Sequence, residues 1–251
     1  MRGRVNGVLF DAGGVLIGPV GGRWNPRYDF EGIVSAHHPE VRADRFAEAI
    51  AEGQRMLDAG VPTAAGTTAA GTTTVNRTEY HRAILRVLGI DRPSAALLRE
   101  LEAPPAKPAV EVFSDVRPVL DRLVTLGVAM SVVSDTWAGL DAVLHEAGIG
   151  DYFAGFVMSE VLGCRKPDPR MYAAGSDLLG LDPGECLFID DDPELVAASV
   201  RLGYRGVVMA REDQPEGTRP GDSGSVGALP VIASLHELVP IVAGTFGVSS
   251  S

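Results

Sequence analysis

The sequence is poor in the features that mark secreted, membrane and nucleic-acid-binding proteins. It contains only two cysteines, Cys164 and Cys186, whose spacing suits neither a disulfide framework nor a metal site. We therefore expect reduced thiols and a cytoplasmic protein. No apolar run approaches the length of a membrane-spanning helix. The net charge of −11 lacks the basic excess that binding to nucleic acid or to an anionic membrane requires.

The sequence does contain enough apolar residues for a substantial core. Its 251 residues are 45% hydrophobic, which is typical of one globular domain or of one domain with a sizeable insertion. From about residue 110 onward, short apolar runs alternate with amphipathic stretches. This alternation predicts an α/β fold, with a parallel sheet covered by helices on both faces. The predicted strands are residues 5–10, 128–133, 156–158, 187–189 and 206–209, with a final strand at residues 231–232.

Reactive side chains stand at the ends of three of these predicted strands. They are Asp11, Ser134 and the pair Asp190 and Asp191, while Lys166 comes just before a predicted helix. In an open parallel sheet, ligands bind beyond the carboxyl ends of the strands. Side chains that are far apart in the sequence are therefore expected to converge there.

These residue types suit metal-assisted phosphoryl transfer. The Asp11 carboxylate could attack phosphorus, and Mg²⁺ prefers hard oxygen ligands such as Asp11, Asp191 and a backbone carbonyl. Lys166 would supply fixed positive charge, and Ser134 would donate a hydrogen bond to a phosphate oxygen. Each residue alone has an ordinary explanation, such as a turn cap or a solvated lysine. The combination and its order favour the active-site interpretation.

The same segments resemble the motifs of the haloacid dehalogenase-like hydrolase superfamily. Residues 10–16 match the first motif, residues 133–135 the second, residues 163–169 the third and residues 188–191 the fourth. The resemblance is to the branch with a helical cap inserted after the first motif and a double aspartate in the last. It implies a Rossmann-like core made of residues 1–18 and 110–245, a mainly α-helical cap made of residues 19–109, and a flexible tail at residues 246–251.

The resemblance also implies a Mg²⁺-dependent phosphatase that acts on a small phosphorylated metabolite, with Asp11 as nucleophile and Ser134 and Lys166 as further catalytic residues. By position, Asp11, the Gly13 carbonyl and Asp191 would hold the metal, with Asp190 in contact with it or one step removed. The expected substrate contacts are Ser134, Asp135, Lys166, Gly14, Arg23 and Trp137. Arg23 is included because a guanidinium can bind an anion through two hydrogen bonds.

The sequence departs from the family pattern at Gly13. Most phosphatases of the family carry there a second Asp, which protonates the leaving oxygen and then activates water. Its absence predicts weak activity that favours good leaving groups. Two alternatives stay open: a metal-independent hydrolase of the 2-haloacid dehalogenase type, and a catalytically silent protein that binds a ligand or a partner. The acidic pair Asp190 and Asp191 argues against the dehalogenase type, because without a cation it would repel an anionic substrate.

Overall fold

The computed structural model describes residues 4–58, 77–103, 109–211 and 229–244. The tail predicted at residues 246–251 lies outside these ranges. The chain divides into two compact units. Residues 1–18 and 110–251 form the first, which we call the core unit, and residues 19–109 form the second, the inserted unit. No helix within the described residues is both long enough and apolar enough to cross a membrane.

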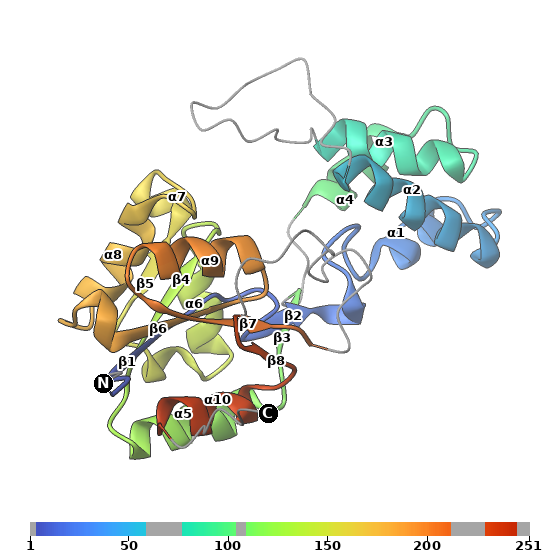
Figure 1. Cartoon of the computed structure of the whole chain (residues 1–251). Coiled ribbons are helices and arrows are strands. Elements are labelled where there is room, and N and C mark those ends of the chain that lie inside the picture. Colours follow the sequence, from blue (N-terminus) through green and yellow to red (C-terminus); the bar gives the residue numbers. More distant parts are fainter. Residues whose placement is uncertain (1–3, 59–76, 104–108, 212–228, 245–251) are drawn as a thin grey trace, which may run out of the picture. The chain divides into compact units, whose positions relative to one another are not determined.

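A six-stranded parallel sheet forms the centre of the core unit (Figure 1). Its strand order is β5–β4–β1–β6–β7–β8. The strands are β1 (Gly7–Phe10), β4 (Ala129–Ser134), β5 (Phe156–Met158), β6 (Cys186–Asp190), β7 (Arg205–Met209) and β8 (Val231–Ile232). The predicted α/β fold with a parallel sheet is confirmed. Because β4 and β6 flank β1, the strand order reverses at β1, where such sheets bind ligands.

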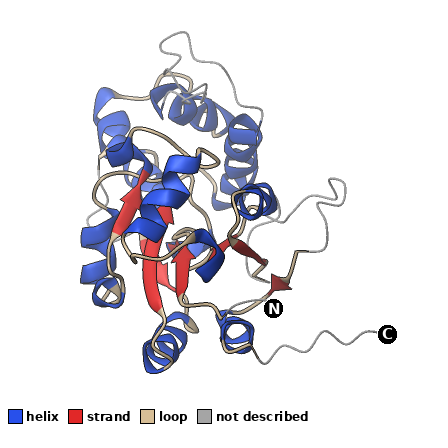
Figure 2. Ribbon diagram, turned by 60° about the vertical axis from the view of Figure 1, so that its left-hand side comes forward, coloured by secondary structure: helices blue, strands red, loops and turns tan. Residues whose placement is uncertain are grey.

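Helices cover both faces of this sheet, which explains why its strands are continuous apolar runs (Figure 2). Val8 and Phe10 of β1 belong to one buried cluster, whereas Leu9 between them belongs to another. The first cluster includes residues of α5 (Val116–Thr125), α6 (Leu140–Glu146) and α10 (Leu238–Val242). The second includes residues of α8 (Pro169–Asp177) and α9 (Pro193–Arg201). A further short helix, α7 (Ser159–Leu162), follows β5.

The inserted unit is helical and has a buried cluster of its own. Its helices are α1 (Phe30–His37), α2 (Phe46–Asp58), α3 (Arg77–Val87) and α4 (Ala95–Glu102). Two short strands, β2 (Ile17–Pro19) and β3 (Val110–Val112), pair with each other where the chain leaves the core unit and returns to it. Turns of 3-10 helix occupy residues 20–22, 43–45, 150–152, 183–185 and 235–237.

Candidate active site

The register of the sheet brings the predicted catalytic residues to one edge. Phe10 is paired with Val132 of β4 and with Ile189 of β6. The next residue, Asp11, is therefore level with the carboxyl ends of both neighbouring strands, and its amide donates to the Ile189 carbonyl at 2.9 Å. Ser134 ends β4 and Asp190 ends β6, and both are buried. The topology thus gathers residues that are up to 180 positions apart in the sequence.

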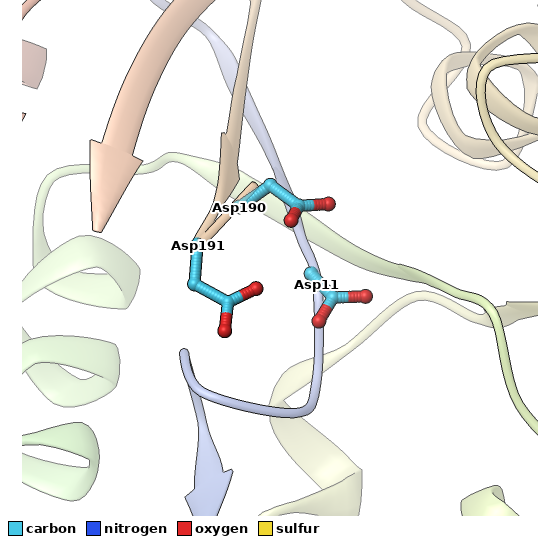
Figure 3. A group of neighbouring side chains, drawn as sticks. All are labelled: Asp11, Asp190 and Asp191. Carbon is cyan, nitrogen blue, oxygen red and sulfur yellow. The ribbon is translucent and has the colours of Figure 1, made fainter. Parts of the chain in front are cut away.

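Three carboxylates meet at this edge, where β1 and β6 end (Figure 3). One oxygen from each of Asp11, Asp190 and Asp191 lies within 4.8 Å of the others, close enough to hold one metal ion. The Lys166 ammonium donates to Asp11 Oδ1 at 2.7 Å and to Asp190 Oδ2 at 2.6 Å. The Lys166 side chain is 2% exposed, so these charges interact with little solvent screening.

Burial and charge shift the pKa values of this cluster. Burial and the charge of Asp11 raise the pKa of Asp191 to about 6. Burial also raises the pKa of Asp190 well above its usual range, although Lys166 opposes that shift. Burial lowers the pKa of Lys166, but the charges of Asp11 and Asp190 outweigh it and raise the pKa above its usual value. The lysine is therefore a permanent cation in the site.

Hydrogen bonds hold the segment that carries Lys166 at two points. The backbone amide of Lys166 donates to Asp135 Oδ1 at 3.0 Å, which joins the third motif to the second. Burial raises the pKa of Asp135 in spite of Lys166 nearby. Asp168 accepts the Arg170 amide at 3.0 Å and caps α8, as the Asp168–Pro169 pair predicts. Asp135 thus positions the lysine segment, a role that does not require contact with substrate.

The turn after Asp11 is closed by its own backbone hydrogen bonds. The amides of Leu16 and Ile17 donate to the Ala12 carbonyl at 2.9 Å, and the Gly14 amide donates to the Ile17 carbonyl at the same distance. Gly14 has a φ of 72°, in the region that favours glycine. Gly13 is not among the described glycines with positive φ, so its backbone accepts a side chain.

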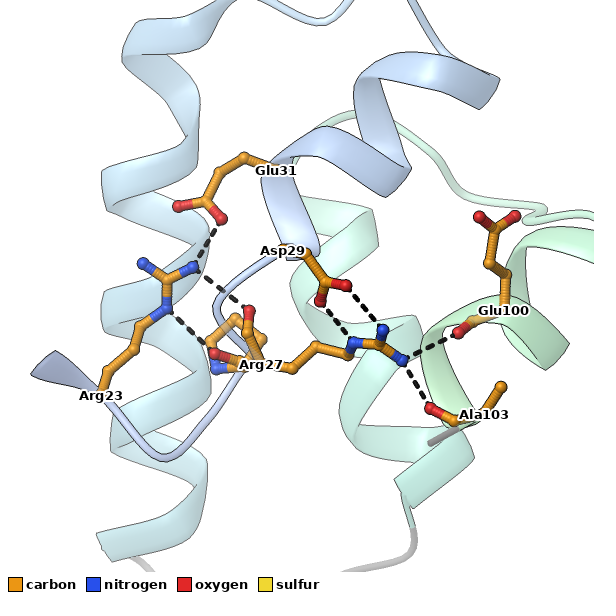
Figure 4. A network of polar contacts seen from close by, with 7 residues as sticks. Arg23, Arg27, Asp29, Glu31, Glu100 and Ala103 are labelled. Atoms are coloured by element: carbon orange, nitrogen blue, oxygen red, sulfur yellow. Dashed lines mark hydrogen bonds and ion pairs between the residues drawn. The ribbon is translucent and has the colours of Figure 1, made fainter. Parts of the chain in front are cut away.

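Trp137 and Arg23 are also predicted to contact the substrate. Trp137 is 49% exposed on the loop that follows β4, two residues beyond Asp135. Arg23 lies in the inserted unit (Figure 4), where it donates to the Pro26 carbonyl at 3.0 Å and forms an ion pair with Glu31. The described contacts of Arg23 thus hold its own loop, and its role toward substrate stays a prediction.

Comparison with known proteins identifies the family. The profile of the haloacid dehalogenase-like hydrolases matches residues 5–203, which is most of the chain and includes all four motifs. The protein belongs to this family.

Relatives of this haloacid dehalogenase-like hydrolase include phosphatases. It is 29% identical to phosphatase MT3486 of Mycobacterium tuberculosis over 47% of its own length, and it spans 55% of the length of that relative. It is 30% identical to a phosphoglycolate phosphatase of Pectobacterium atrosepticum over 64% of this chain and 72% of the relative. These relationships make the protein a hydrolase of this family and leave its substrate to be proposed.

Solved structures of both phosphatases and dehalogenases share the fold. A phosphatase of the family from Thermococcus onnurineus matches with a TM-score of 0.55 and 20% identity, covering 95% of this chain and 98% of the other. The L-2-haloacid dehalogenase of Xanthobacter autotrophicus matches with a TM-score of 0.57 and 19% identity, covering 96% of this chain and all of the other. At such identities the likeness shows the fold alone.

The sequence analysis does not predict a role for Arg211, whose side chain contacts the turn next to the site. The Arg211 guanidinium donates to the carbonyls of Gly14 and Val15, in the turn that follows Asp11. It also pairs with Asp115, which is buried. No local sequence signal pointed to this contact, because its partners lie about 100 and 200 residues away from Arg211.

Proposed function

We propose that this hydrolase is a Mg²⁺-dependent phosphatase that acts on small phosphorylated metabolites through a phosphorylated Asp11. The observation that carries the proposal is the charge of the buried site, where three carboxylates meet and the ammonium of Lys166 pairs with two of them. Burial and the charge of Asp11 both raise the pKa values of Asp190 and Asp191, and a bound cation would offset these effects by stabilising the ionised carboxylates. Carboxylate oxygens are the ligands that Mg²⁺ prefers, so the residues present fit this ion.

The proposed reaction uses the residues at the sheet edge. An oxygen of Asp11 attacks the phosphorus, the bond from phosphorus to the leaving oxygen breaks, and Asp11 carries the phosphoryl group. Lys166 holds positive charge beside that group, and Ser134 donates a hydrogen bond to one of its oxygens. Water then attacks the phosphorus, which releases phosphate and restores the Asp11 carboxylate. Mg²⁺ bound by Asp11, Asp191 and the Gly13 carbonyl would stabilise negative charge on the transferred oxygens.

One observation favours a second candidate, a hydrolase of the 2-haloacid dehalogenase type. Gly13 leaves the site without the acid that most phosphatases of the family carry, and dehalogenases of the family also lack it. An Asp11 nucleophile serves both reactions. The carboxylates at Asp190 and Asp191 favour the phosphatase, because they would repel an anionic haloacid unless a cation were bound.

Release assays separate the two candidates. Purified protein is incubated with a panel of phosphorylated metabolites and with a 2-haloacid, each in Mg²⁺ or in excess chelator, and phosphate and halide are measured. We expect phosphate release that requires Mg²⁺ and is abolished in Asp11→Asn, because a neutral amide cannot attack phosphorus. Asp191→Ala should lose the response to Mg²⁺. Halide release that persists in chelator would contradict the phosphatase and support the dehalogenase.

A further inference from the structure

A buried arginine holds the backbone next to the nucleophile. Arg211 lies two residues beyond β7, and its side chain is 9% exposed. Its Nε donates to the Gly14 carbonyl at 3.2 Å, and its Nη2 donates to the Val15 carbonyl at 2.7 Å. Buried carbonyls need hydrogen-bond partners, and a guanidinium offers several donors in a rigid plane. One side chain therefore satisfies two consecutive carbonyls of this turn.

The guanidinium is itself held from two other sides. Its Nη1 donates to Asp115 Oδ2 at 3.0 Å, and its Nη2 lies 3.0 Å from Asp115 Oδ1 without the alignment of a hydrogen bond. Its central carbon lies 4.0 Å from the centre of the Phe113 ring, a cation–π contact. Asp115 in turn accepts the Ser234 hydroxyl and the Leu235 amide, both at 2.8 Å.

The positive charge of Arg211 and the negative charge of Asp115 neutralise each other. Burial raises the pKa of Asp115, but hydrogen bonds from Arg211, Ser234 and the Leu235 amide outweigh it and keep the pKa below its usual value. The carboxylate is therefore ionised, and the ion pair is permanent at neutral pH.

Arg211 contacts both connections between the two units from inside the core unit. Gly14 and Val15 precede β2, where the chain leaves, and Phe113 follows β3, where it returns. Phe113 also donates its amide to the Leu16 carbonyl at 3.2 Å, and its ring would contact a Cβ at Gly18 at 2.7 Å. The turn that carries Gly13 is thus held by one residue that follows β7, about 200 positions away in the sequence.

We propose that Arg211 is a positioning residue of the active site, which fixes the turn of residues 12–17 relative to Asp11 and thereby sets the position of the Gly13 carbonyl. This inference rests on the proposed function for its catalytic consequence. Displacement of reacting groups by about 1 Å can cost on the order of 100-fold in rate, so a loosened turn should lower turnover. A lysine at position 211 would keep the positive charge, but it lacks the planar guanidinium with its several N–H donors. It therefore cannot donate to Asp115 and to both carbonyls together.

The test compares Arg211→Lys with Ser234→Ala. Both variants remove hydrogen bonds from the same buried network, but only the first loses contacts with Gly14 and Val15. Amide hydrogen exchange is measured in peptides that cover residues 12–17, with β1 and β6 as internal reference. We expect at least 10-fold faster exchange of the Gly14, Leu16 and Ile17 amides in Arg211→Lys, and wild-type exchange in Ser234→Ala.

Turnover of 4-nitrophenyl phosphate in Mg²⁺, well below the melting temperature of each variant, gives the catalytic readout. We expect Arg211→Lys to lower kcat at least 10-fold with a smaller change in KM, and Ser234→Ala to keep the wild-type kcat. Unchanged exchange in Arg211→Lys, or faster exchange with unchanged kcat, would overturn the proposal. A wild-type protein that hydrolyses no phosphate ester would instead overturn the proposed function, and the exchange data would still decide whether Arg211 holds the turn.

Discussion

Gly13 is the residue at which this site differs most from a typical phosphatase of its family. A positioned general acid contributes about 10²–10⁴-fold to turnover, and most when the leaving group is a poor one. Gly13 has no positive φ, so an Asp can be introduced without backbone strain. We expect Gly13→Asp to raise turnover of alkyl phosphates more than that of aryl phosphates, whose leaving oxygen needs less protonation.

The measurement is a leaving-group series on both forms in Mg²⁺. The wild-type rate should fall steeply as the leaving-group pKa rises, and the slope should flatten in Gly13→Asp. Gly13→Ala is the matched control, because it adds the Cβ without a proton donor. A flat wild-type slope with no gain in Gly13→Asp would mean that another residue or the substrate itself supplies the proton.

His81 makes the inserted unit sensitive to acid. It is 5% exposed on α3, its Nδ1 has no hydrogen-bond partner, and burial lowers its pKa to about 4. Glu102 raises that pKa, while Arg77 and Arg27 lower it further. In the unfolded chain the pKa is about 6.5. Between these values the unfolded state binds more protons, so stability falls as the pH drops from about 6.5 toward 4, by at most about 3 kcal/mol.

Replacing His81 removes this dependence. We expect His81→Leu to flatten the stability of the inserted unit between pH 6.5 and 4 and to keep or increase it at pH 7, because no unpaired buried nitrogen remains. His38→Gln is the control, since His38 is partly exposed and pairs with Glu40. Urea unfolding followed through Trp24 fluorescence, in a Trp137→Phe background, reports the inserted unit alone. If the stability of His81→Leu depended on pH as strongly as that of the wild type, groups other than His81 would cause the acid sensitivity.

Among the residues, sequence reasoning found the groups that stand at strand ends and missed those that act through distant contacts. Asp11, Ser134, Asp190 and Asp191 each follow an apolar run, and the edge of a parallel sheet must gather them. Arg211 follows a strand end as well, but its contacts with Gly14, Val15, Phe113 and Asp115 depend on tertiary packing. Nothing in its local sequence distinguishes it from a solvated arginine.

At the scale of elements, one arginine joins the entry loop of the inserted unit to the end of α4. Arg27 pairs through two nitrogens with Asp29 and donates to the carbonyls of Glu100 and Ala103 (Figure 4). Arg42 pairs with Asp44 in the same way and at the same spacing, but its side chain is 79% exposed and its described hydrogen bonds go to that neighbour in the sequence. The Arg27–Asp29 pair therefore differs from the Arg42–Asp44 pair in two ways: it is more buried, and its arginine also binds the end of α4.

We therefore expect Arg27→Ala to destabilise the inserted unit by about 1–3 kcal/mol, because it removes the charge-assisted hydrogen bonds of Arg27 to Asp29 and to the carbonyls at the end of α4. Arg27→Lys should restore little, since an ammonium cannot serve two carbonyls and a carboxylate in this geometry. Arg42→Ala should cause no measurable change, because exposed pairs contribute little. Thermal unfolding followed through Trp24 tests this, and equal losses in the two alanine variants would contradict it.

The sequence predicts the elements whose ends carry a local signal such as a helix cap. It does not predict the elements whose bounds depend on contacts with other parts of the chain. Asp168 and Asp192 are each followed by a proline, a pair that predicts a helix start. They cap α8 and α9, and each side chain accepts an amide two residues on. The spacing of Trp137, Leu140 and Leu144 predicts a helix that begins at Trp137, but α6 begins only at Leu140. The preceding segment is held instead by α7, where the Glu160 amide donates to the Thr136 carbonyl and the Glu160 carboxylate accepts the Ala138 amide. The strands β2 and β3 have three residues each and carry no periodicity to detect.

At the scale of the whole molecule, each unit has its own buried cluster and its own tryptophan. Trp24 lies in the inserted unit and Trp137 in the core unit, and the chain has no other tryptophan. The groups proposed to bind Mg²⁺, namely Asp11, Asp191 and the Gly13 carbonyl, all belong to the core unit. A ligand stabilises only the cooperative unit whose folded form binds it. Mg²⁺ should therefore act on one of the two unfolding transitions.

We expect Mg²⁺ at 100 times its dissociation constant to stabilise the core unit by about 2.7 kcal/mol. The reporter for this unit is Trp137 in a Trp24→Phe variant, and the shift should vanish in Asp191→Ala. The inserted unit, followed through Trp24 in Trp137→Phe, should unfold at the same urea concentration with and without Mg²⁺, because its own cluster holds it together. Ca²⁺ prefers more oxygen ligands at longer distances than Mg²⁺ does, so it should stabilise the core unit less. Equal shifts of both transitions would show that the two units unfold together. If Mg²⁺ shifted neither transition, the proposed Mg²⁺ site would be wrong.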